Sequence, residues 1–477
     1  MNSIKSIFKN IFYLLFLLLI TLLVLLSFKL IKPVEQIKIN KVLSSEVNNL
    51  NIDGQEFRDL NKNGQLDIYE DHRNLPRDRA NDLLGKMTLE EKVGQMFHPP
   101  FILKPDLLMF LYEIAIRGNS STESQIVFDH ITHFNLYGNP SPAELAKKIN
   151  SLQKTASRSR LGIPITISSD PIHEVPKGGG VASFSVDGFS KWPSQLGFAA
   201  TSNPKIIREF AEIVREEYLA VGIRTALHPM SDLATEPRWA RNFGTFGSNA
   251  EMSSKMTIEY MNGFQQKDIS NNSVLTMVKH FPGGGPQENG LDPHLFSGRN
   301  QIYPGDNFEY HLLPFREAIK NNLKVVMPYY GIPVGQTDED VAMAFNSYIL
   351  RDLLREELKF DGVICSDWGI ITGRHWGVDE LSIEQRYEKS IKAGIDQYGG
   401  EKDTNYLIDL VKNGQITEVR IDESVRRILL NKFELGLFDD PYVNEELVQY
   451  KVNTQDNIEA GLEAQRKSIV LLENNGI

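Results

Sequence analysis

The chain has 477 residues, enough for one large α/β barrel with attachments or for two ordinary domains. Its formal net charge of −11 argues against a nucleic-acid partner, and no basic, aromatic-interleaved patch contradicts this. The single cysteine, Cys365, excludes an internal disulfide and a zinc site built from several thiolates. We expect Cys365 to be a small buried core residue.

Residues 1–32 predict a membrane anchor. Lys5 and Lys9 precede a nearly unbroken apolar run, residues 11–28, which is about as long as a bilayer core requires. No small-x-small cleavage site follows, so the run favours an uncleaved signal anchor over the alternative, a cleaved signal peptide. Such an anchor usually exports the polar domain behind it, so we expect a membrane-anchored protein whose catalytic domain is periplasmic or extracellular.

Residues 33–75 are interpreted as a polar tether that contains a calcium loop. Residues 59–70 fit the pattern D-x-[DN]-x-[DN]-G-x5-E at every specified position. Alternate side chains of this pattern point oxygens inward, and its glycine permits a sharp turn. The alternative is an acidic, Asn-rich surface turn. The predicted ligands of a structural Ca²⁺ are Asp59, Asn61, Asn63, Gln65 through its carbonyl, and Glu70, with Asp67 in direct or water-mediated contact.

Two helical signals follow the loop. Residues 77–97 have a helical apolar stripe, and Thr88 with Glu91 forms a capping box within them. Ser141 as a cap and Pro142 in the first turn predict a helix over residues 142–160. The region before this helix has no clear pattern.

From residue 163 onward, short apolar, β-rich runs alternate with helical stretches. This alternation predicts a parallel sheet. Six or more such units without a dinucleotide glycine fingerprint favour a (β/α)8 TIM-type barrel over a doubly wound sheet. The expected strands are residues 163–169, 222–227, 274–278, 325–328, 363–365 and 394–396, and the expected helices are residues 204–221, 250–266, 310–321, 347–358 and 383–393.

Polar and aromatic side chains stand at the ends of these expected strands. One such carboxylate often only caps the next helix. The carboxyl ends of barrel strands, however, share the face on which active sites are built. Hydrogen-bonding groups around one or two carboxylates, with an aromatic platform, suit a pyranose sugar, whereas no serine elbow, zinc-protease motif or phosphate loop is present. The predicted site residues are Asp170, Arg241, Lys279, His280, Tyr329, Asp367 and Trp368.

Six of these residues, all but Tyr329, lie in motifs that together resemble glycoside hydrolase family 3. The motifs are Asp-x-x-His at 170–173, residues 232–241, Lys-His-Phe-Pro-Gly at 279–283 and Ser-Asp-Trp at 366–368. The resemblance covers about residues 75–477. The glycines at 283–285, with Asp-Pro-His at 292–294, resemble the β-glucosidase-like bacterial branch.

The resemblance implies a retaining exo-β-glycosidase that releases terminal β-D-glucosyl residues from β-linked oligosaccharides or glycosides, with no cofactor for catalysis. Asp367 would be the nucleophile that forms a glycosyl–enzyme intermediate. Four residues would bind hydroxyls of the first sugar, and two aromatic residues would line the subsite. The former are Asp170, Arg241, Lys279 and His280, and the latter are Tyr329 and Trp368.

Retaining hydrolysis needs a second carboxyl group as acid/base, about 5 Å from the nucleophile. In most of the family this Glu lies on a second α/β domain. We assign the barrel to residues 76–440 and interpret residues 441–477 as a linker and the first strand of such a domain, truncated or split here.

A subset of the family instead uses an Asp–His pair, and Asp292 with His294 has that form at a different spacing from Lys279. Otherwise Pro293 fixes a turn between two surface residues. The alternative functions are a catalytically impaired, membrane-tethered sugar-binding remnant and a β-N-acetylhexosaminidase that uses His294.

Overall fold

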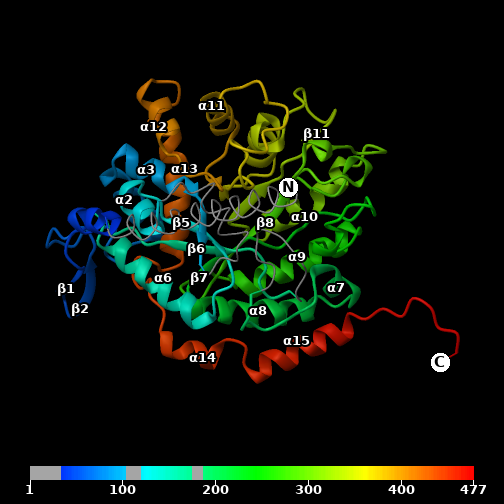
Figure 1. The fold of residues 1–477 in the computed structure, drawn as a ribbon, viewed down its shortest axis with the longest axis horizontal. Helices are drawn as coiled ribbons and strands as arrows, with labels where there is room; N and C mark the ends of the chain where they lie inside the picture. The colour runs from blue at the N-terminus through cyan, green and yellow to red at the C-terminus, as the bar shows by residue number, and fades with distance from the viewer. Residues whose placement is uncertain (1–33, 104–119, 175–185, 477) are drawn as a thin grey trace, which may run out of the picture.

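The computed structural model describes residues 34–103, 120–174 and 186–476. Its strands lie in the middle of the molecule with helices around them (Figure 1). Seven parallel strands form the central sheet in the order β12-β10-β8-β7-β6-β5-β4. These strands are β4 (Pro100–Ile102), β5 (His133–Tyr137), β6 (Thr166–Ser169), β7 (Ile223–Ala226), β8 (Leu275–Phe281), β10 (Val325–Pro328) and β12 (Val363–Ile364).

Further pairings connect the two ends of this sheet. Directly after β12, Cys365 forms a parallel bridge with Gln397. Then β13 (Tyr398–Gly399) pairs in parallel with β3 (Phe97–His98), which lies just before β4 in the chain. This arrangement confirms the predicted parallel α/β fold and is consistent with a TIM-like domain. Cys365 is fully buried, as predicted.

The helices form the outer layer. The bounds of α8 (Pro204–Val221) and α11 (Ile383–Ala393) agree with the prediction, whereas residues Tyr348–Glu357 form a π-helix (η5). The predicted capping box is present at α3 (Leu89–Gln95), where Glu91 N donates to Thr88 Oγ1 and Thr88 N donates to Glu91 Oε2. Other helices include α2 (Pro76–Lys86), α5 (Thr122–Phe128), α6 (Pro142–Ser157), α7 (Gln195–Ala200), α9 (Ala250–Gln265), α10 (Phe308–Lys320), α12 (Asn405–Lys412), α13 (Glu418–Glu434), α14 (Val448–Lys451) and α15 (Gln455–Lys467).

The interpretation of residues 33–75 as a tether is wrong for residues 48–59. These residues form an antiparallel hairpin, β1 (Asn48–Ile52) and β2 (Gln55–Asp59). Asp53 and Gly54 at its turn both have positive φ, 54° and 77°, and an Asp-Gly pair is a strong signal for such a turn. Phe57 is buried, so the hairpin packs against the domain.

The last strand begins later than predicted. Residues 394–396 form no strand, and β13 starts at Tyr398. Asp396 is fully buried, where it pairs with Arg355 at 2.6 Å and Arg427 at 3.1 Å and accepts a hydrogen bond from Ile364 N. This ion cluster occupies the position that the apolar pattern assigned to the strand.

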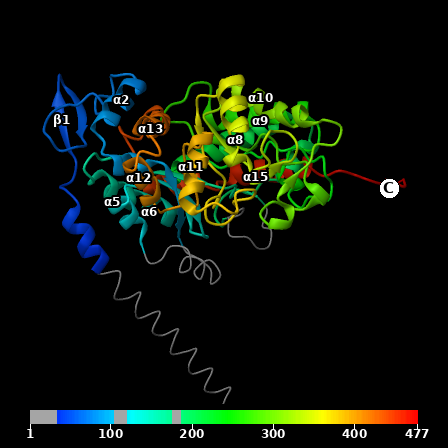
Figure 2. The same ribbon diagram turned by 90° about the horizontal axis from the view of Figure 1, so that it is seen from above.

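The segment interpreted as the first strand of a second domain is not a strand in this structure. Residues 448–467 form α14 and α15, and residues 468–476 have no regular secondary structure. The side chains of Ile469–Leu472 are 58–92% exposed, and this end of the chain extends away from the domain (Figure 2). A strand forms only where another strand pairs with it.

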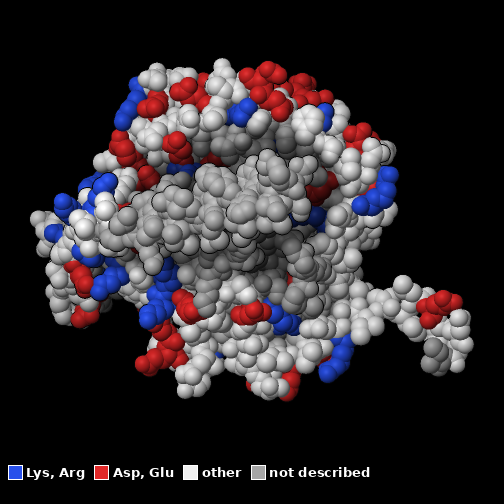
Figure 3. Space-filling view, viewed as in Figure 1, with Lys and Arg blue, Asp and Glu red and all other residues white. Residues whose placement is uncertain are grey.

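Among the residues that the structure describes, no helix is both long enough and apolar enough to cross a membrane. The predicted anchor, residues 1–32, lies outside the described residues, so the anchor and the location outside the cytoplasm stay predictions. On the face drawn in Figure 3, acidic side chains gather along the upper edge, where Figure 1 places α11, and basic side chains are scattered.

Candidate active site

Asp367 follows β12 in a buried position, and one of its carboxylate oxygens accepts no hydrogen bond from the residues that the structure describes. Its side chain is 9% exposed. Oδ1 accepts a hydrogen bond from Trp368 N at 2.8 Å, whereas Oδ2 has no hydrogen-bond partner among the described residues. The indole Nε1 of Trp368 is also buried and has no hydrogen-bond partner among the residues that the structure describes. Buried polar atoms are nearly always paired, so these two atoms indicate a place for a polar ligand.

Asp170 and Lys279 form a buried ion pair at the carboxyl ends of β6 and β8. Asp170 follows β6, and its Oδ1 lies 2.8 Å from Lys279 Nζ of β8. Its Oδ2 accepts a hydrogen bond from Asn135 Nδ2 of β5 at 3.2 Å. The carboxylate is therefore held by side chains of β5 and β8, with its charge compensated, as a fixed hydrogen-bond acceptor.

His280 connects this ion pair to Asp367. Its Nε2 lies 3.8 Å from Asp367 Oδ2, and its Nδ1 lies 2.6 Å from Asp232 Oδ2. Asp232 is fully buried and also accepts hydrogen bonds from the backbone N–H groups of His280 and Gly284. Burial lowers the pKa of the His280 imidazole and outweighs the opposing effect of Asp232. Asp232 thus fixes the orientation of His280.

The glycines at 283–285 allow the loop after β8 to approach Asp232 and Tyr329 closely. A Cβ at Gly284 would lie 2.7 Å from Asp232 Oδ1 and 2.8 Å from the Tyr329 ring. A Cβ at Gly285 would overlap the carbonyl oxygen of Leu233 at 1.6 Å. The glycine run therefore serves close packing around Asp232 and Tyr329.

Arg241 and Tyr329 complete the cluster. Arg241 precedes the short helix η1 (Asn242–Gly244), and its guanidinium donates to Tyr329 Oη at 3.1 Å. The Tyr329 ring lies 4.2 Å from the His280 ring. Burial opposes the charge of Arg241, but Tyr329, Asp292 and Asp367 raise its pKa, so it stays cationic.

The structure thus places all seven predicted residues in one contact network, from the carboxyl ends of four strands and the segment after β7. Lys279 and His280 lie within β8, which extends beyond its predicted end at residue 278. Sequence reasoning gave no role to Asp232 or Asn135. Asn135 could have been noticed in the sequence, because it is an amide inside the apolar run of β5. His173, in the first motif, instead pairs with the buried Glu217 at 2.6 Å.

Asp292 and His294 belong to the edge of this cluster, so Asp292 is more than a surface turn residue. Asp292 Oδ1 lies 2.5 Å from His294 Nδ1, and its Oδ2 accepts hydrogen bonds from Trp239 Nε1 and Tyr329 Oη. The imidazole of His294 lies 4.8 Å from the Tyr330 ring. His294 is 39% exposed, so its imidazole lies at the open edge of the site.

Large apolar side chains flank this pair on the same loop. Leu291, Leu295 and Phe296 are 44%, 66% and 56% exposed. Phe296 stacks edge-on against Trp376 at 5.6 Å, and Trp376 Nε1 donates to Pro293 O. These contacts hold the loop in place. We call Leu291, Leu295 and Phe296 the apolar rim.

The predicted calcium loop is a second candidate site. Asp59 and Glu70 are each 4% exposed, and neither forms an ion pair with another described residue. Asp59 accepts hydrogen bonds from the N–H groups of Asn63 and Gly64, and Glu70 accepts them from Leu60, Asn61 and Asp67. Within the described ranges, no group of three or more His, Cys, Asp or Glu side chains could hold a metal ion. The predicted ligand set differs because it includes two asparagines and a carbonyl.

The domain carries a buried carboxylate among cationic and aromatic groups at the ends of its parallel strands. This arrangement is typical of an enzyme that acts on sugars. Residues 88–430 match the family described as "Glycosyl hydrolase family 3 N terminal domain". The chain therefore belongs to glycoside hydrolase family 3.

Individual relatives agree with this assignment. The chain is 46% identical to "Beta-glucosidase C" of Emericella nidulans over 87% of its own length and 68% of that protein. It is 38% identical to "Periplasmic beta-glucosidase/beta-xylosidase" of Dickeya chrysanthemi, over 90% of this chain and 69% of that one. The matched part thus spans about two thirds of these relatives. A solved β-glucosidase of Listeria innocua in complex with glucose has 25% identity and a TM-score of 0.68, and the match covers 84% of this chain and 52% of that one.

Proposed function

We propose that the chain works as a retaining β-glucosidase that removes terminal β-D-glucosyl units through a covalent intermediate on Asp367. The observation that carries the proposal is the free, buried Oδ2 of Asp367, which lies beside His280 and Trp368. The names of the relatives support the sugar, since proteins called β-glucosidase are 46% and 45% identical to this chain.

In the proposed reaction, Asp367 Oδ2 attacks the anomeric carbon, and the bond to the leaving oxygen breaks. A general acid gives a proton to the leaving oxygen, which departs as an alcohol; water then cleaves the glycosyl ester with net retention and returns a proton to that acid. Asp170 and Lys279 would hold hydroxyl groups of the sugar, and Arg241 would balance the charge that surrounds Asp367. Asp170 and Asp232 are already held by Lys279 and His280, so neither is placed to donate the proton.

The apolar rim would contact the aglycone, which is the leaving group of the substrate. It adjoins the cluster through Asp292, which accepts a hydrogen bond from Tyr329, and through His294, which contacts Tyr330. Burying an exposed Leu or Phe side chain against an apolar aglycone stabilises a complex by about 1–2 kcal/mol. We therefore propose a preference for β-glucosides with apolar or aromatic aglycones.

A panel of glucosides tests both parts of this proposal. We expect hydrolysis of methyl and octyl β-D-glucoside with β-D-glucose as the first product by NMR, and no hydrolysis of octyl α-D-glucoside. We expect kcat/KM for the octyl β-glucoside to exceed that for the methyl β-glucoside by about tenfold. Hydrolysis without retention contradicts the Asp367 mechanism, and equal values for the two β-glucosides contradict the role of the rim.

We also propose that residues 59–70 bind a structural Ca²⁺. Two buried carboxylates, Asp59 and Glu70, lack an ion-pair partner in the described part of the chain, and burial raises the pKa of Glu70. A hard cation with oxygen ligands would compensate this charge. Asn61, Asn63 and the carbonyl of Gln65 would supply further oxygens.

Removal of the metal should lower thermal stability. A ligand present well above its Kd stabilises a fold by a few kcal/mol, so we expect a chelator to lower Tm by about 3–8 °C and excess Ca²⁺ to restore it. The Glu70→Gln variant should have a lower Tm that the chelator no longer changes. An identical wild-type Tm with and without the chelator would contradict the proposal.

A further inference from the structure

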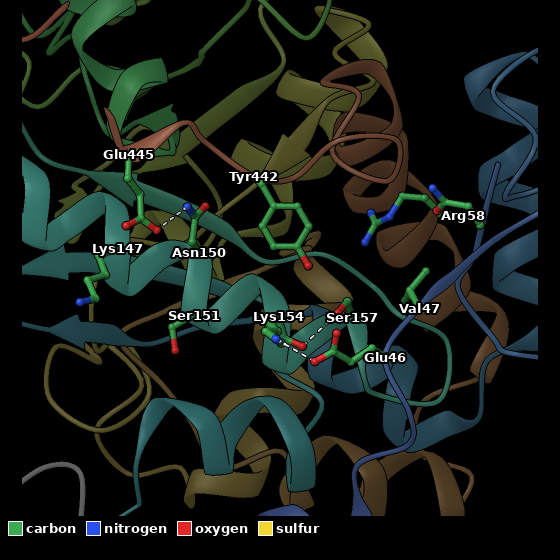
Figure 4. A pocket seen from close by; sticks show the side chains of 11 residues that line it. Glu46, Val47, Arg58, Lys147, Asn150, Ser151, Lys154, Ser157, Tyr442 and Glu445 are labelled. Carbon is green, nitrogen blue, oxygen red and sulfur yellow. Dashed lines mark hydrogen bonds and ion pairs between the residues drawn. The ribbon is translucent and has the colours of Figure 1, made fainter. Parts of the chain in front are cut away.

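We propose that a groove between the hairpin, α6 and the segment after α13 is a second, non-catalytic binding site for a neutral β-glucan chain. The groove has a volume of about 620 Å³, and none of the seven predicted active-site residues lines it. Three segments far apart in the sequence build it, as Figure 4 shows. Its lining residues include Glu46, Arg58, Lys147, Asn150, Ser151, Lys154, Tyr442 and Glu445.

Hydrogen bonds tie the walls of the groove together. Arg58 of the hairpin donates to Phe438 O at 2.8 Å. Asn150 of α6 bonds the backbone of Val443 in both directions, at 2.9 and 3.0 Å. Ser44, just before the hairpin, and Arg158, just after α6, are also hydrogen-bonded to each other. The groove is therefore preformed, and a ligand need not pay for ordering it.

Tyr442 supplies the aromatic surface. Its side chain is 41% exposed, and its ring lies among the other labelled residues in Figure 4. The guanidinium of Arg58 lies 5.8 Å from the ring centroid, which helps to fix the ring. A flat, partly exposed ring in a groove can stack on the apolar face of a pyranose.

Hydrogen-bonding groups surround the ring. The side chains of Lys147, Ser151 and Tyr442 make no hydrogen bond to any other described residue. Glu445 offers an acceptor, since Asn150 Nδ2, at 2.9 Å, is its one side-chain hydrogen-bond partner among the described residues. Sugar hydroxyls are both donors and acceptors, so they match this mixture.

The charges of the groove nearly cancel, which is compatible with a neutral ligand. Lys154 is paired with Glu46 at 2.7 Å. The carboxylate of Glu445 opposes the remaining cations, Arg58 and Lys147. The lining thus has three cations and two carboxylates, so its charges nearly cancel and a neutral glucan meets no net repulsion. The choice of a β-linked glucan rests on the proposed β-glucosidase function.

Affinity electrophoresis of the full chain in gels that contain a soluble β-glucan tests the proposal. We expect the β-glucan to retard the wild-type protein. Tyr442→Ala should bind about five- to tenfold more weakly, because a stacking contact is lost. Ser151→Arg, on the exposed face of α6, should also weaken binding by filling the groove. Both variants should keep the wild-type kcat/KM for octyl β-D-glucoside.

The controls separate this site from the catalytic one. Tyr450→Ala removes a tyrosine that is 69% exposed and does not line the groove, so it should leave retardation unchanged. Retardation of Tyr442→Ala equal to that of the wild type would overturn the proposal, as would retardation by polygalacturonate but not by the β-glucan. A wild-type protein that is retarded but hydrolyses no glucoside would contradict the proposed function and leave the binding site standing.

Discussion

Replacing Asp367 by Asn should reduce turnover of an aryl β-D-glucoside at least about a thousandfold. The amide is nearly the same size as the carboxylate but is a poor nucleophile, so no glycosyl ester can form. Folding should survive, because among the described residues Asp367 has one unpaired oxygen and forms no ion pair with a Lys or Arg. The measurement is kcat/KM, with a circular dichroism spectrum and a Tm for each protein.

A matched control is available six residues earlier. Asp361 is 94% exposed, and Asp361→Asn should keep wild-type turnover. A 2-deoxy-2-fluoro glucoside with a dinitrophenolate leaving group needs no protonation to react. It should therefore label Asp367 of the wild type by mass spectrometry, whichever residue supplies the proton in normal turnover. Labelling of another residue would refute the assignment even if Asp367→Asn were inactive.

The fold was predictable where several weak signals agreed. In α8, an Asn-Pro start, an apolar stripe and a terminal Gly222 together mark both ends of the helix. The strands β3, β4 and β5 were missed because they are short and mostly buried, so they show no alternation to read. β13 was misplaced because residues 394–396 look like a strand, although Asp396 lies in a buried cluster of arginines that no local pattern announces.

The site could be predicted where its residues stand at the ends of strands, because barrel geometry brings strand ends together in space. Strand-end residues such as Asp170 and Asp367 are almost two hundred positions apart, yet parallel strands bring them to one face. The supporting residues could not be found in this way. Asp232 acts through a hydrogen bond to His280, which is 48 positions away in the sequence. That contact is seen only in the structure, where the loop of glycines packs against Asp232.

Replacing Asp170 by Asn should lower kcat/KM for β-glucosides by about 10²–10³-fold. The carboxylate is the proposed acceptor for sugar hydroxyls, and its loss also leaves Lys279, which is 4% exposed, without its counter-charge. Breaking a buried ion pair by removing one partner costs about 3–5 kcal/mol. We therefore expect a lower Tm together with the loss of activity, measured by thermal unfolding and by octyl β-D-glucoside hydrolysis.

The double variant Asp170→Asn with Lys279→Met distinguishes binding from folding. Because the two groups act as one pair, the double variant should recover part of the lost Tm, since no uncompensated charge remains. Its activity should stay as low as that of the single variant, because the sugar loses both partners. Asp268→Asn, a change at an exposed position, should alter neither quantity. Activity that returns together with stability would mean that Asp170 supports the fold and does not bind the sugar.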